Sequence, residues 1–218
     1  IAATILDYAG IAEKDSGMMA ITGKTWRPIL ESEKSGRVIA ERDHTLIGKK
    51  RTDVGRPHDW GYPIRGIVTD THLFLKNYEP TRWPAGNLET GYLDTDGGPT
   101  KSLILAQHRN QPDDPAWLAS FGLRPEEELY DLATDPDCVE NVVGHLDRAA
   151  VRFTLADRLE STLRAQADPR LVGSDPEVFD THPFANPDFV DFYERFRDGK
   201  VSLPRSMAPT DVDPPVNP

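Results

Sequence analysis

A polar segment between residues 48 and 61 concentrates side chains that can bind an anion. It is rich in glycine and contains five of six candidate substrate-binding residues, the sixth being a histidine just upstream: Lys50, Arg51, Asp53, Arg56, His58 and His44. Arginine binds sulfate or carboxylate through a planar fork of N–H donors, and lysine adds a mobile point charge. Because long loops inside compact domains are usually functional, we predict an anion-binding site here. The alternative is a solvated basic loop.

Other kinds of chemistry find less support in the sequence. His44, Asp53, His58 and Asp59 are of metal-ligand type, but no H-x-x-x-H or H-E-x-x-H spacing places them on one element. The run DTDGG at residues 94–98 lacks the later acidic positions of a calcium loop. No serine lies in a G-x-S-x-G elbow. The sequence therefore predicts neither a metal site nor a catalytic residue within this chain.

The tryptophans differ in the residues that stand beside them in the sequence. Trp83 lies between Arg82 and Pro84, and we predict that it either stacks on a sugar ring or covers the core. Trp26, Trp60 and Trp117 lack a clear polar context, which predicts packing roles for them.

Composition limits the partners. The 218-residue chain has a net charge of -11, which argues against nucleic acid or an anionic membrane as a general partner. No apolar run reaches the roughly 20 residues that a membrane span needs. Cys138 is the one cysteine, so an intrachain disulfide and a cysteine-based zinc cluster are both excluded.

Strand and helix patterns predict an α+β fold, in which a small antiparallel sheet is packed by a C-terminal helix. Alternating residues predict a hairpin turning at Thr69-Asp70, and the full set of expected strands is Val38–Glu41, Tyr62–Thr69, Thr71–Tyr78 and Glu127–Leu132. The expected helices are Ala2–Ala9, a single turn with Trp26, Ile29 and Leu30 inward, Lys101–His108, Pro115–Phe121, Leu146–Ala165 and a last one with Asn186 as its N-cap and Gly199 beyond its end.

The helix over residues 146–165 has the clearest pattern. Its predicted apolar stripe is Ala149, Phe153, Ala156, Leu159 and Leu163. Glu160 and Arg164 have the i,i+4 spacing of an ion pair. After residue 200 the chain is polar and rich in proline, which predicts a tail that is disordered or laid along a surface.

Several segments resemble the sulfatase family. TILDYAGI at residues 4–11 resembles a sulfatase helix reading close to PTLLDLAGI, and ELYDLATDPDCVENV at 128–143 is similar to the C-terminal motif ELYDLxxDPxExxN. The hairpin at 61–86 and the run DPRLVGSDPEVFDTHPF at 168–184 resemble the branch that includes heparan N-sulfatase. The resemblance covers nearly the whole chain and corresponds to the C-terminal part of a sulfatase, a family with an alkaline-phosphatase-like fold.

The resemblance implies a division of the chain and an activity. Residues 1–36 would end a large N-terminal domain, 37–200 would form the C-terminal subdomain, and 201–218 would be the tail. The intact enzyme would hydrolyse a sulfate ester or sulfamate of a sulfated sugar, using a formylglycine nucleophile and calcium. This chain would supply substrate contacts through the loop at 48–59, in which Thr52 stands where relatives often have histidine.

The catalytic parts of that family have no counterpart in the sequence. Formylglycine forms from Cys or Ser in a C/S-x-P-x-R context, whereas Cys138 is followed by VENV. The run SLPRS at 202–206 places its arginine one position too early. Because the chain begins with Ile1 inside an expected helix, we expect a fragment, a processed product or a partial chain. Its partners would be the missing catalytic domain and a sulfated sugar, with a homo-oligomer as a further expectation.

Three alternatives remain open from the sequence. The chain could be a stand-alone module that binds sulfated carbohydrate, a relative that hydrolyses phosphonates or phosphate monoesters, or an unrelated hydrolase that uses His58 and Asp59 with a metal. A periplasmic or secreted origin is an expectation by family analogy alone.

Overall fold

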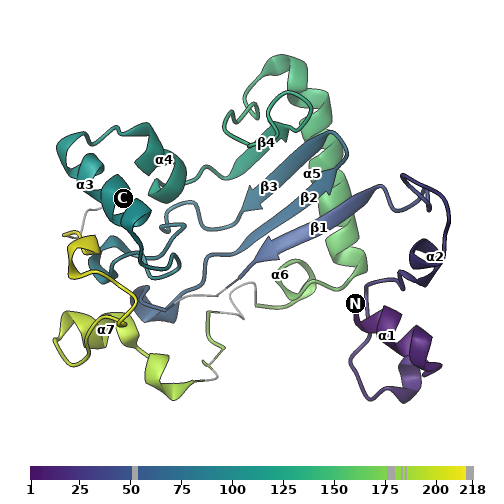
Figure 1. Ribbon diagram of the computed structural model, residues 1–218, viewed down its shortest axis with the longest axis horizontal. Helices are drawn as coiled ribbons and strands as arrows, with labels where there is room; N and C mark the ends of the chain where they lie inside the picture. The colour runs from purple at the N-terminus through teal and green to yellow at the C-terminus, as the bar shows by residue number, and fades with distance from the viewer. Residues whose placement is uncertain (51–53, 176–179, 183, 185, 215–218) are drawn as a thin grey trace. The chain divides into compact units, whose positions relative to one another are not determined.

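The computed structural model describes residues 1–50, 54–175, 180–182, 184 and 186–214 (Figure 1). The chain divides into two compact units, residues 1–45 and 46–218. Among the described residues, no helix combines the length and the apolar character that crossing a bilayer requires.

The first unit contains two short helices, as expected. Helix α1 (Ala2–Ala9) ends at Gly10, whose φ of 67° is left-handed, and α2 (Arg27–Leu30) is a single turn. Hydrogen bonds join the two helices, since the Trp26 amide donates to Thr4 Oγ1 (2.9 Å) and Thr25 Oγ1 donates to Asp7 Oδ2 (2.7 Å). These polar bonds, rather than an apolar core, hold the unit together.

Two expectations for the first unit are wrong. Trp26, Ile29 and Leu30 do not point inward, because their exposed fractions are 51%, 36% and 61%. Residues 38–41 form no strand; the strand β1 begins later, at His44, and ends at Lys49. A short segment with alternating residues becomes a strand only where a neighbouring strand pairs with its backbone N–H and C=O groups. In this chain it is β1 that joins the sheet, and its Leu46 packs against the core.

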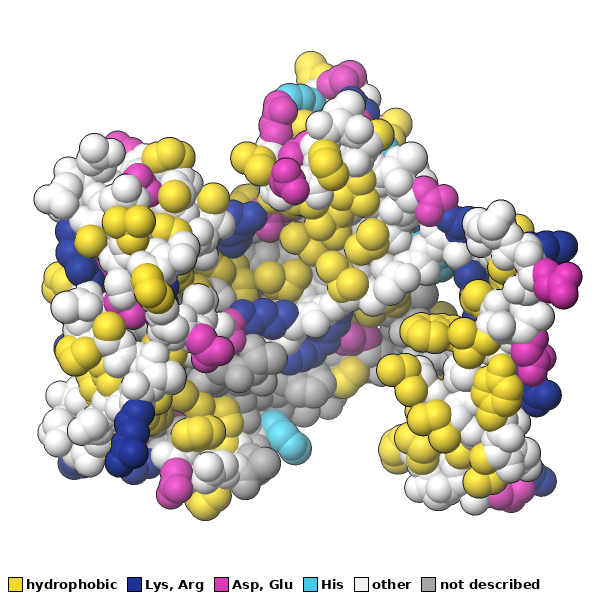
Figure 2. Space-filling view, in the orientation of Figure 1, with side chains coloured by type: hydrophobic (Ala, Val, Ile, Leu, Met, Phe, Trp, Pro, Cys, Tyr) yellow, Lys and Arg dark blue, Asp and Glu magenta, His cyan; other side chains and the backbone are white. Residues whose placement is uncertain are grey.

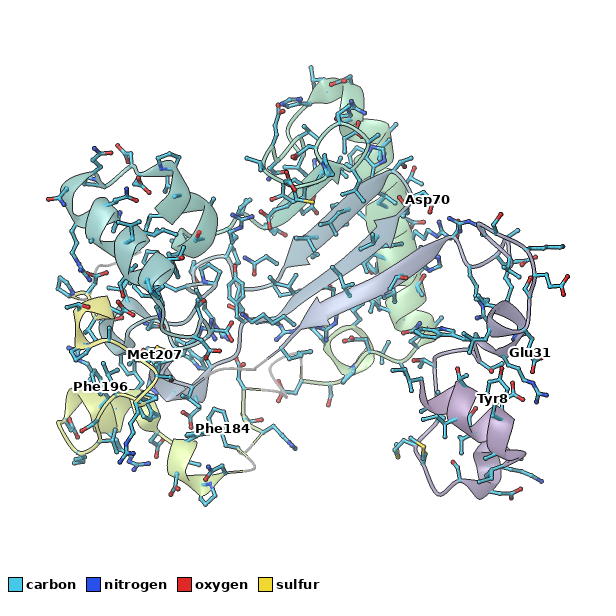
Figure 3. All side chains as sticks on the ribbon, viewed as in Figure 1. Tyr8, Glu31, Asp70, Phe184, Phe196 and Met207 are labelled. Atoms are coloured by element: carbon cyan, nitrogen blue, oxygen red, sulfur yellow. The ribbon has the colours of Figure 1, made fainter. Side chains whose placement is uncertain are left out.

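The fold is α+β, with a four-stranded antiparallel sheet. Its order is β1-β2-β3-β4, where β2 is Ile64–Thr69, β3 is His72–Asn77 and β4 is Glu127–Asp131. The predicted hairpin is confirmed, with Asp70 at its tip (Figure 3). The register aligns Ile67, Phe74 and Leu129 across three strands, and it aligns Arg65, Lys76 and Glu127 in the next row on the same face.

Helix α5 (Ala149–Ala165) covers that face of the sheet (Figure 1). The apolar row of the sheet packs on Leu155, Leu159 and Leu163, all of them buried. The predicted stripe was wrong at Phe153, which is 65% exposed. Each residue of an α-helix is rotated by about 100° from the one before, so residues two apart point to nearly opposite sides of the helix. A helix that directs Leu155 toward the sheet therefore directs Phe153 to solvent.

A second cluster forms beside the sheet. The predicted helices are confirmed as α3 (Pro99–Asn110) and α4 (Pro115–Phe121), each with proline in its first turn. They surround the buried aromatic residues Trp83, Tyr92, Trp117 and Phe121. Trp83 is only 8% exposed and therefore belongs to the core, not to a sugar-binding surface.

The described part of the C-terminal tail lies along α3. Ser102 Oγ donates to Asp211 Oδ1 (2.7 Å), and Arg109 Nε donates to Asp213 Oδ1 (2.7 Å). Asp211 is fully buried, and Met207 packs nearby (Figure 3). Of the two predicted states of the tail, a segment laid on a surface is the one found for residues 201–214.

The predicted helix from Asn186 to Gly199 is broken. Asn186 caps a single 3-10 turn, Pro187–Phe189, and the helix α7 (Phe192–Arg197) follows only after Asp191 adopts a left-handed φ of 52°. The break has a tertiary cause, because the Asp191 amide donates to Asp59 Oδ2 (2.9 Å) instead of continuing a helix.

The sheet face opposite α5 is apolar but only partly covered. Val68, Leu73 and Leu75 are half-buried there, and Ile47 is 41% exposed. Figure 2 shows hydrophobic side chains gathered over these strands. The alternation of side chains along each strand thus divides the sheet into one packed and one half-solvated face.

Candidate functional site

The loop that follows β1 is closed at its base and held against the second cluster. The Tyr62 amide donates to the Lys50 carbonyl (2.7 Å), and Thr90 Oγ1 donates to the Gly55 carbonyl (2.7 Å). Gly55 has a φ of 84°, and a Cβ there would lie 2.7 Å from Leu93 Cδ1, so only glycine fits. The loop is therefore a fixed part of the fold at its described residues.

Arg56 also helps to hold this loop in place. Its side chain is 2% exposed, and its Nη2 donates to the carbonyls of Trp83 (2.7 Å) and Pro84 (3.2 Å). The guanidinium also lies over the Tyr62 ring, 5.4 Å from its centroid. A guanidinium with so little exposed surface offers little to a ligand, so this arginine acts chiefly as a structural anchor of the loop.

Lys50 belongs to a cluster of charges at the base of the loop. Arg65 of β2 pairs with Asp168, which precedes the helix α6 (Pro169–Val172), at 2.8 Å between Nε and Oδ2. Arg170 of α6 lies over the Tyr78 ring, 5.3 Å from the centroid. Lys50 is half-buried and interacts electrostatically with both arginines and with Asp168 and Asp180. We call Lys50, Arg65 and Arg170 the cationic cluster.

The environment of Lys50 changes its titration. Burial, together with the charges of Arg65 and Arg170, lowers the pKa of Lys50 from 10.5 to about 8. A lysine held in this way is mostly charged at neutral pH, and the charges of Asp168 and Asp180 oppose the lowering of its pKa. An anion bound beside it would relieve this repulsion.

The shifted pKa predicts a pH-dependent stability difference between the wild type and Lys50→Met. Between about pH 8 and 10.5 the unfolded chain holds the proton that the folded chain has lost, so wild-type stability rises with pH in this window. Below pH 8 the Lys50→Met variant is expected to be the more stable by about 1–2 kcal/mol, after allowance for solvent screening. Urea unfolding of both proteins at pH 7 and at pH 10 measures this difference in stability.

The matched control is Lys200→Met, because Lys200 is 67% exposed and pairs with the exposed carboxylate of Asp198 at 2.7 Å. Its stability difference from the wild type should stay constant over the same pH range. A constant difference for Lys50→Met as well would contradict the lowered pKa.

A second group of side chains lies around Asp180. Asp180 Oδ1 accepts from the Gly61 amide (2.9 Å), and Oδ2 accepts from Arg82 Nη1 (2.8 Å). Arg82 also donates to the Gly61 carbonyl (2.9 Å) and lies over the Trp60 ring, 4.8 Å from the centroid. Hydrogen bonds thus hold both the N–H and the C=O of Gly61, and this fixes the position of the neighbouring Trp60.

His58 lies next to this group in a strained backbone. His58 and Asp59 both have a left-handed φ of 56°, which non-glycine residues rarely adopt. Helix α7 and the residue before it support them, since the His58 amide donates to Glu194 Oε1 (2.8 Å) and Asp59 Oδ2 accepts from Asp191. The His58 ring is 69% exposed and its centroid lies 4.9 Å from that of Trp60.

The remaining predicted residues fall outside this arrangement. His44 is the first residue of β1 and pairs with Asp43 (Nδ1 to Oδ1, 2.9 Å), whereas the loop follows the last residue of that strand. Arg51, Thr52 and Asp53 lie outside the described residues. Of the predicted site residues that the structure describes, His58 is exposed to the solvent, whereas the Nζ atom of Lys50 is buried.

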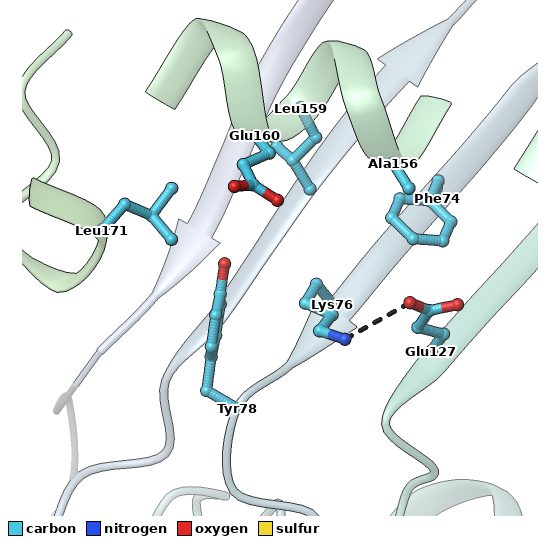
Figure 4. A pocket seen from close by; sticks show the side chains of 8 residues that line it. All are labelled: Phe74, Lys76, Tyr78, Glu127, Ala156, Leu159, Glu160 and Leu171. Atoms are coloured by element: carbon cyan, nitrogen blue, oxygen red, sulfur yellow. Dashed lines mark hydrogen bonds and ion pairs between the residues drawn. The ribbon is translucent and has the colours of Figure 1, made fainter. Parts of the chain in front are cut away.

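A small pocket opens between α5 and the sheet (Figure 4). Its volume is ≈ 120 Å³, below the roughly 300–1,000 Å³ of small-molecule sites. Lys76 and Glu127 form an ion pair on one wall (3.3 Å), and Tyr78 stands between Lys76 and Leu171. The pocket is too small for a sugar, but Tyr78 connects its wall to Arg170 of the cationic cluster.

The described residues do not fit the two groups that the sulfatase resemblance implies. Cys138 is half-buried at a φ of 55°, and burial together with Asp135 and Asp137 raises the pKa of its thiol, the opposite of nucleophile activation. Within the part of the chain that the structure describes, no three His, Cys, Asp or Glu side chains gather as a metal site. We therefore derive no catalytic step from formylglycine or calcium in this chain.

Sequence reasoning missed most of this site. Arg82, Arg170, Asp168 and Asp180 were not predicted, and Trp60 was predicted as packing although it is 38% exposed. One signal was present: Arg65 alternates with Ile67 and Thr69 on one face of a strand, and an arginine on a core-facing row requires a buried partner.

Comparisons with known proteins give a limited result. A scan against known protein families finds no match, and a search of curated proteins finds none. Among solved structures, one similar chain is BT4656, solved in complex with its substrate D-glucosamine-2-N,6-O-disulfate. The likeness covers 80% of this chain and 25% of that one, at 20% sequence identity and a TM-score of 0.48. This chain therefore spans a quarter of the length of the solved chain that it resembles.

Proposed function

We propose that this chain is the C-terminal part of a sulfatase that hydrolyses sulfate esters or sulfamates of a sulfated sugar. Its contribution would be to hold the anionic groups of the substrate, while the nucleophile and the calcium ligands would lie in another part of the enzyme. The proposal rests on the sulfatase-like segments at residues 4–11 and 128–143 and on the charges at the base of the loop. An N-sulfated glucosamine is the finer form of the same proposal.

The observation that carries the proposal is a local excess of positive charge in an acidic chain. Among the described residues around the base of the loop, four cations lie with three carboxylates, an excess of one: Lys50, Arg65, Arg82 and Arg170 with Glu79, Asp168 and Asp180. The whole chain has a net charge of -11. A cationic region within a chain of negative net charge attracts anions from solution and orients them at close range.

Sulfate suits these donors better than a neutral ligand does. Lys50 would provide a point charge, and Arg65 and Arg170, each 8% exposed, would act on a bound sulfate through their charge and not as exposed N–H forks. Because Lys50 is half-buried, the attraction between its charge and a bound sulfate is screened less than at an exposed site.

Binding measurements on the purified chain test the proposal. D-glucosamine-2-N,6-O-disulfate and unsulfated glucosamine are titrated by calorimetry at low and at physiological salt. We expect the disulfate to bind at least about tenfold more tightly than glucosamine, and its affinity to fall as salt rises. The Lys50→Gln variant should lose most of this preference, whereas Lys200→Gln, which changes an exposed lysine, should keep it.

The outcomes separate the proposed function from its alternatives. Equal affinity for the two sugars would contradict it. Tight binding of the disulfate, with no C/S-x-P-x-R motif encoded upstream of Ile1, would favour a stand-alone binding module. A preference for a sugar phosphate over the sulfate would favour a phosphate-ester hydrolase instead.

A further inference from the structure

The C-terminal segment from Asp191 to Asp213 contacts the candidate loop directly. Glu194 Oε1 accepts from the His58 amide at 2.8 Å, and the Asp191 amide donates to Asp59 Oδ2 at 2.9 Å. His58 and Asp59 both have a left-handed φ of 56°. Backbone of this kind persists only where surrounding contacts impose it. The conformation of the loop at these two residues therefore depends on the C-terminal segment.

The same segment holds the loop a second time, through the turn that begins at Leu88. The Asp213 amide donates to the Leu88 carbonyl at 3.1 Å, and the Tyr92 hydroxyl donates to Asp213 Oδ2 at 3.1 Å. Between Leu88 and Tyr92, the fully buried Thr90 donates its Oγ1 hydrogen to the Gly55 carbonyl at 2.7 Å. The tail thus holds the short segment that in turn holds the loop at Gly55.

A side chain of helix α3 fastens the end of the C-terminal segment. Arg109 Nε donates to Asp213 Oδ1 at 2.7 Å, and its Nη2 donates to the Thr210 carbonyl at 2.6 Å. The Asp213 side chain is only 11% exposed. Its carboxylate therefore accepts from two side chains, Arg109 and Tyr92, and is the point at which this end of the segment is fixed.

Few apolar side chains anchor the segment. Between residues 186 and 214, all of which the structure describes, the buried apolar side chains are Phe192 and Met207, at 6% and 9% exposure (Figure 3). The core under α5 contains seven buried apolar side chains. Because apolar burial supplies most of the free energy that resists unfolding, the C-terminal segment should open more readily than the sheet.

We propose that residues 191–213 act as a strap that releases as one unit, and that its release frees the candidate loop at residues 55–61. The closed strap imposes the left-handed backbone of the loop, which relaxes to ordinary backbone angles when the strap opens. Since coupling between two sites is reciprocal, a weaker contact at Glu194 should loosen the contact at Asp213, and the reverse. The strap would act on the loop whatever ligand binds there.

Hydrogen exchange of the purified chain, followed amide by amide with NMR, tests the strap. In the wild type, the amides of His58 and Asp213 should be protected to within about threefold of each other, and less than the amide of Phe74 in β3. Asp213→Ala should raise the exchange rate of the distant His58 amide by at least about tenfold, because it removes the acceptor of two side-chain hydrogen bonds. Glu194→Ala should accelerate the Asp213 amide in the same way.

The matched control is Asp198→Ala, which removes a carboxylate of the same segment that is 58% exposed and pairs with Lys200. It should leave the exchange of the His58 and Asp213 amides unchanged. Acceleration only of the amide nearest to each substitution would overturn the strap, because the two contacts would then be independent. Equal protection of His58, Asp213 and Phe74 in the wild type would also overturn it, since release would then require global unfolding, and this comparison needs no variant.

Discussion

Replacing Asp168 by asparagine is expected to lower the free energy of unfolding by about 3–5 kcal/mol. The side chains of Arg65 and Asp168 are only 9% and 13% exposed, and they pair at 2.8 Å. The asparagine amide would keep an oxygen acceptor for the cap of α6, where the carboxylate accepts from the Arg170 amide at 3.0 Å. The substitution would remove the negative charge, however, and leave the Arg65 guanidinium buried close to the like charges of Lys50 and Arg170.

The pH dependence gives this prediction a second test. Burial by itself raises the pKa of Asp168, but the hydrogen bond and the charge of Arg65 outweigh burial and hold that pKa below its ordinary 3.8. The stabilisation is therefore fully present above about pH 4 and is lost as the pH falls through the lowered folded-state pKa. The difference between the wild type and Asp168→Asn should shrink in that acidic range.

The control is an ion pair of similar geometry at the surface. Glu160 and Arg164 of α5 form the predicted i,i+4 pair at 2.7 Å, with side chains that are 57% and 52% exposed. Glu160→Gln is expected to cost less than about 0.5 kcal/mol, because water screens the pair and solvates either partner alone. Urea unfolding of both variants decides the matter, and equal losses would mean that burial does not distinguish the two pairs.

Replacing Phe74 by alanine is expected to cost about 3–5 kcal/mol, through lost apolar burial and the cavity that remains. Phe74 is 1% exposed and lies in the middle of the row Ile67, Phe74 and Leu129, against α5. The small pocket beside it, with a volume of ≈ 120 Å³, would merge with the new space and prevent neighbouring side chains from closing it.

Phe153→Ala is the matched control for this prediction. The sequence pattern placed Phe153 on the apolar stripe of α5, whereas the structure leaves it 65% exposed. Its removal should change the free energy of unfolding by no more than about 0.5 kcal/mol. A large loss at Phe153 together with a small one at Phe74, both measured by urea unfolding, would mean that α5 presents the face first predicted from its sequence.

Under the proposed function, the site would bind the substrate and would not supply the reacting groups. Its cations meet carboxylates and the rings of His58 and Trp60 are exposed, while Cys138 lies in an acidic turn that disfavours its thiolate. Such an arrangement can select and orient a substrate whose reacting bond is cleaved by groups from elsewhere. This is the division of labour that the proposed function requires.

Patterns among residues close in sequence determined the helices and strands of this protein. The hairpin of β2 and β3 follows from alternating residues on either side of a tight turn, and α3 and α4 begin where proline can occupy a first helical turn. These interactions join residues close in sequence, so the pattern of residue types contains them. The same local origin explains why the basic segment after β1 could be singled out as a candidate site.

Only the tertiary structure decided which residues of that site meet. Arg65 and Asp168 are 103 positions apart, Gly61 and Asp180 are 119 apart, and His58 and Glu194 are 136 apart. Partners so distant leave no periodicity in the sequence, since loop closure and packing bring them together. For the same reason Arg56 proved to be a buried anchor, and of the two tryptophans beside Arg82 and the loop, Trp60 proved to be exposed and Trp83 buried.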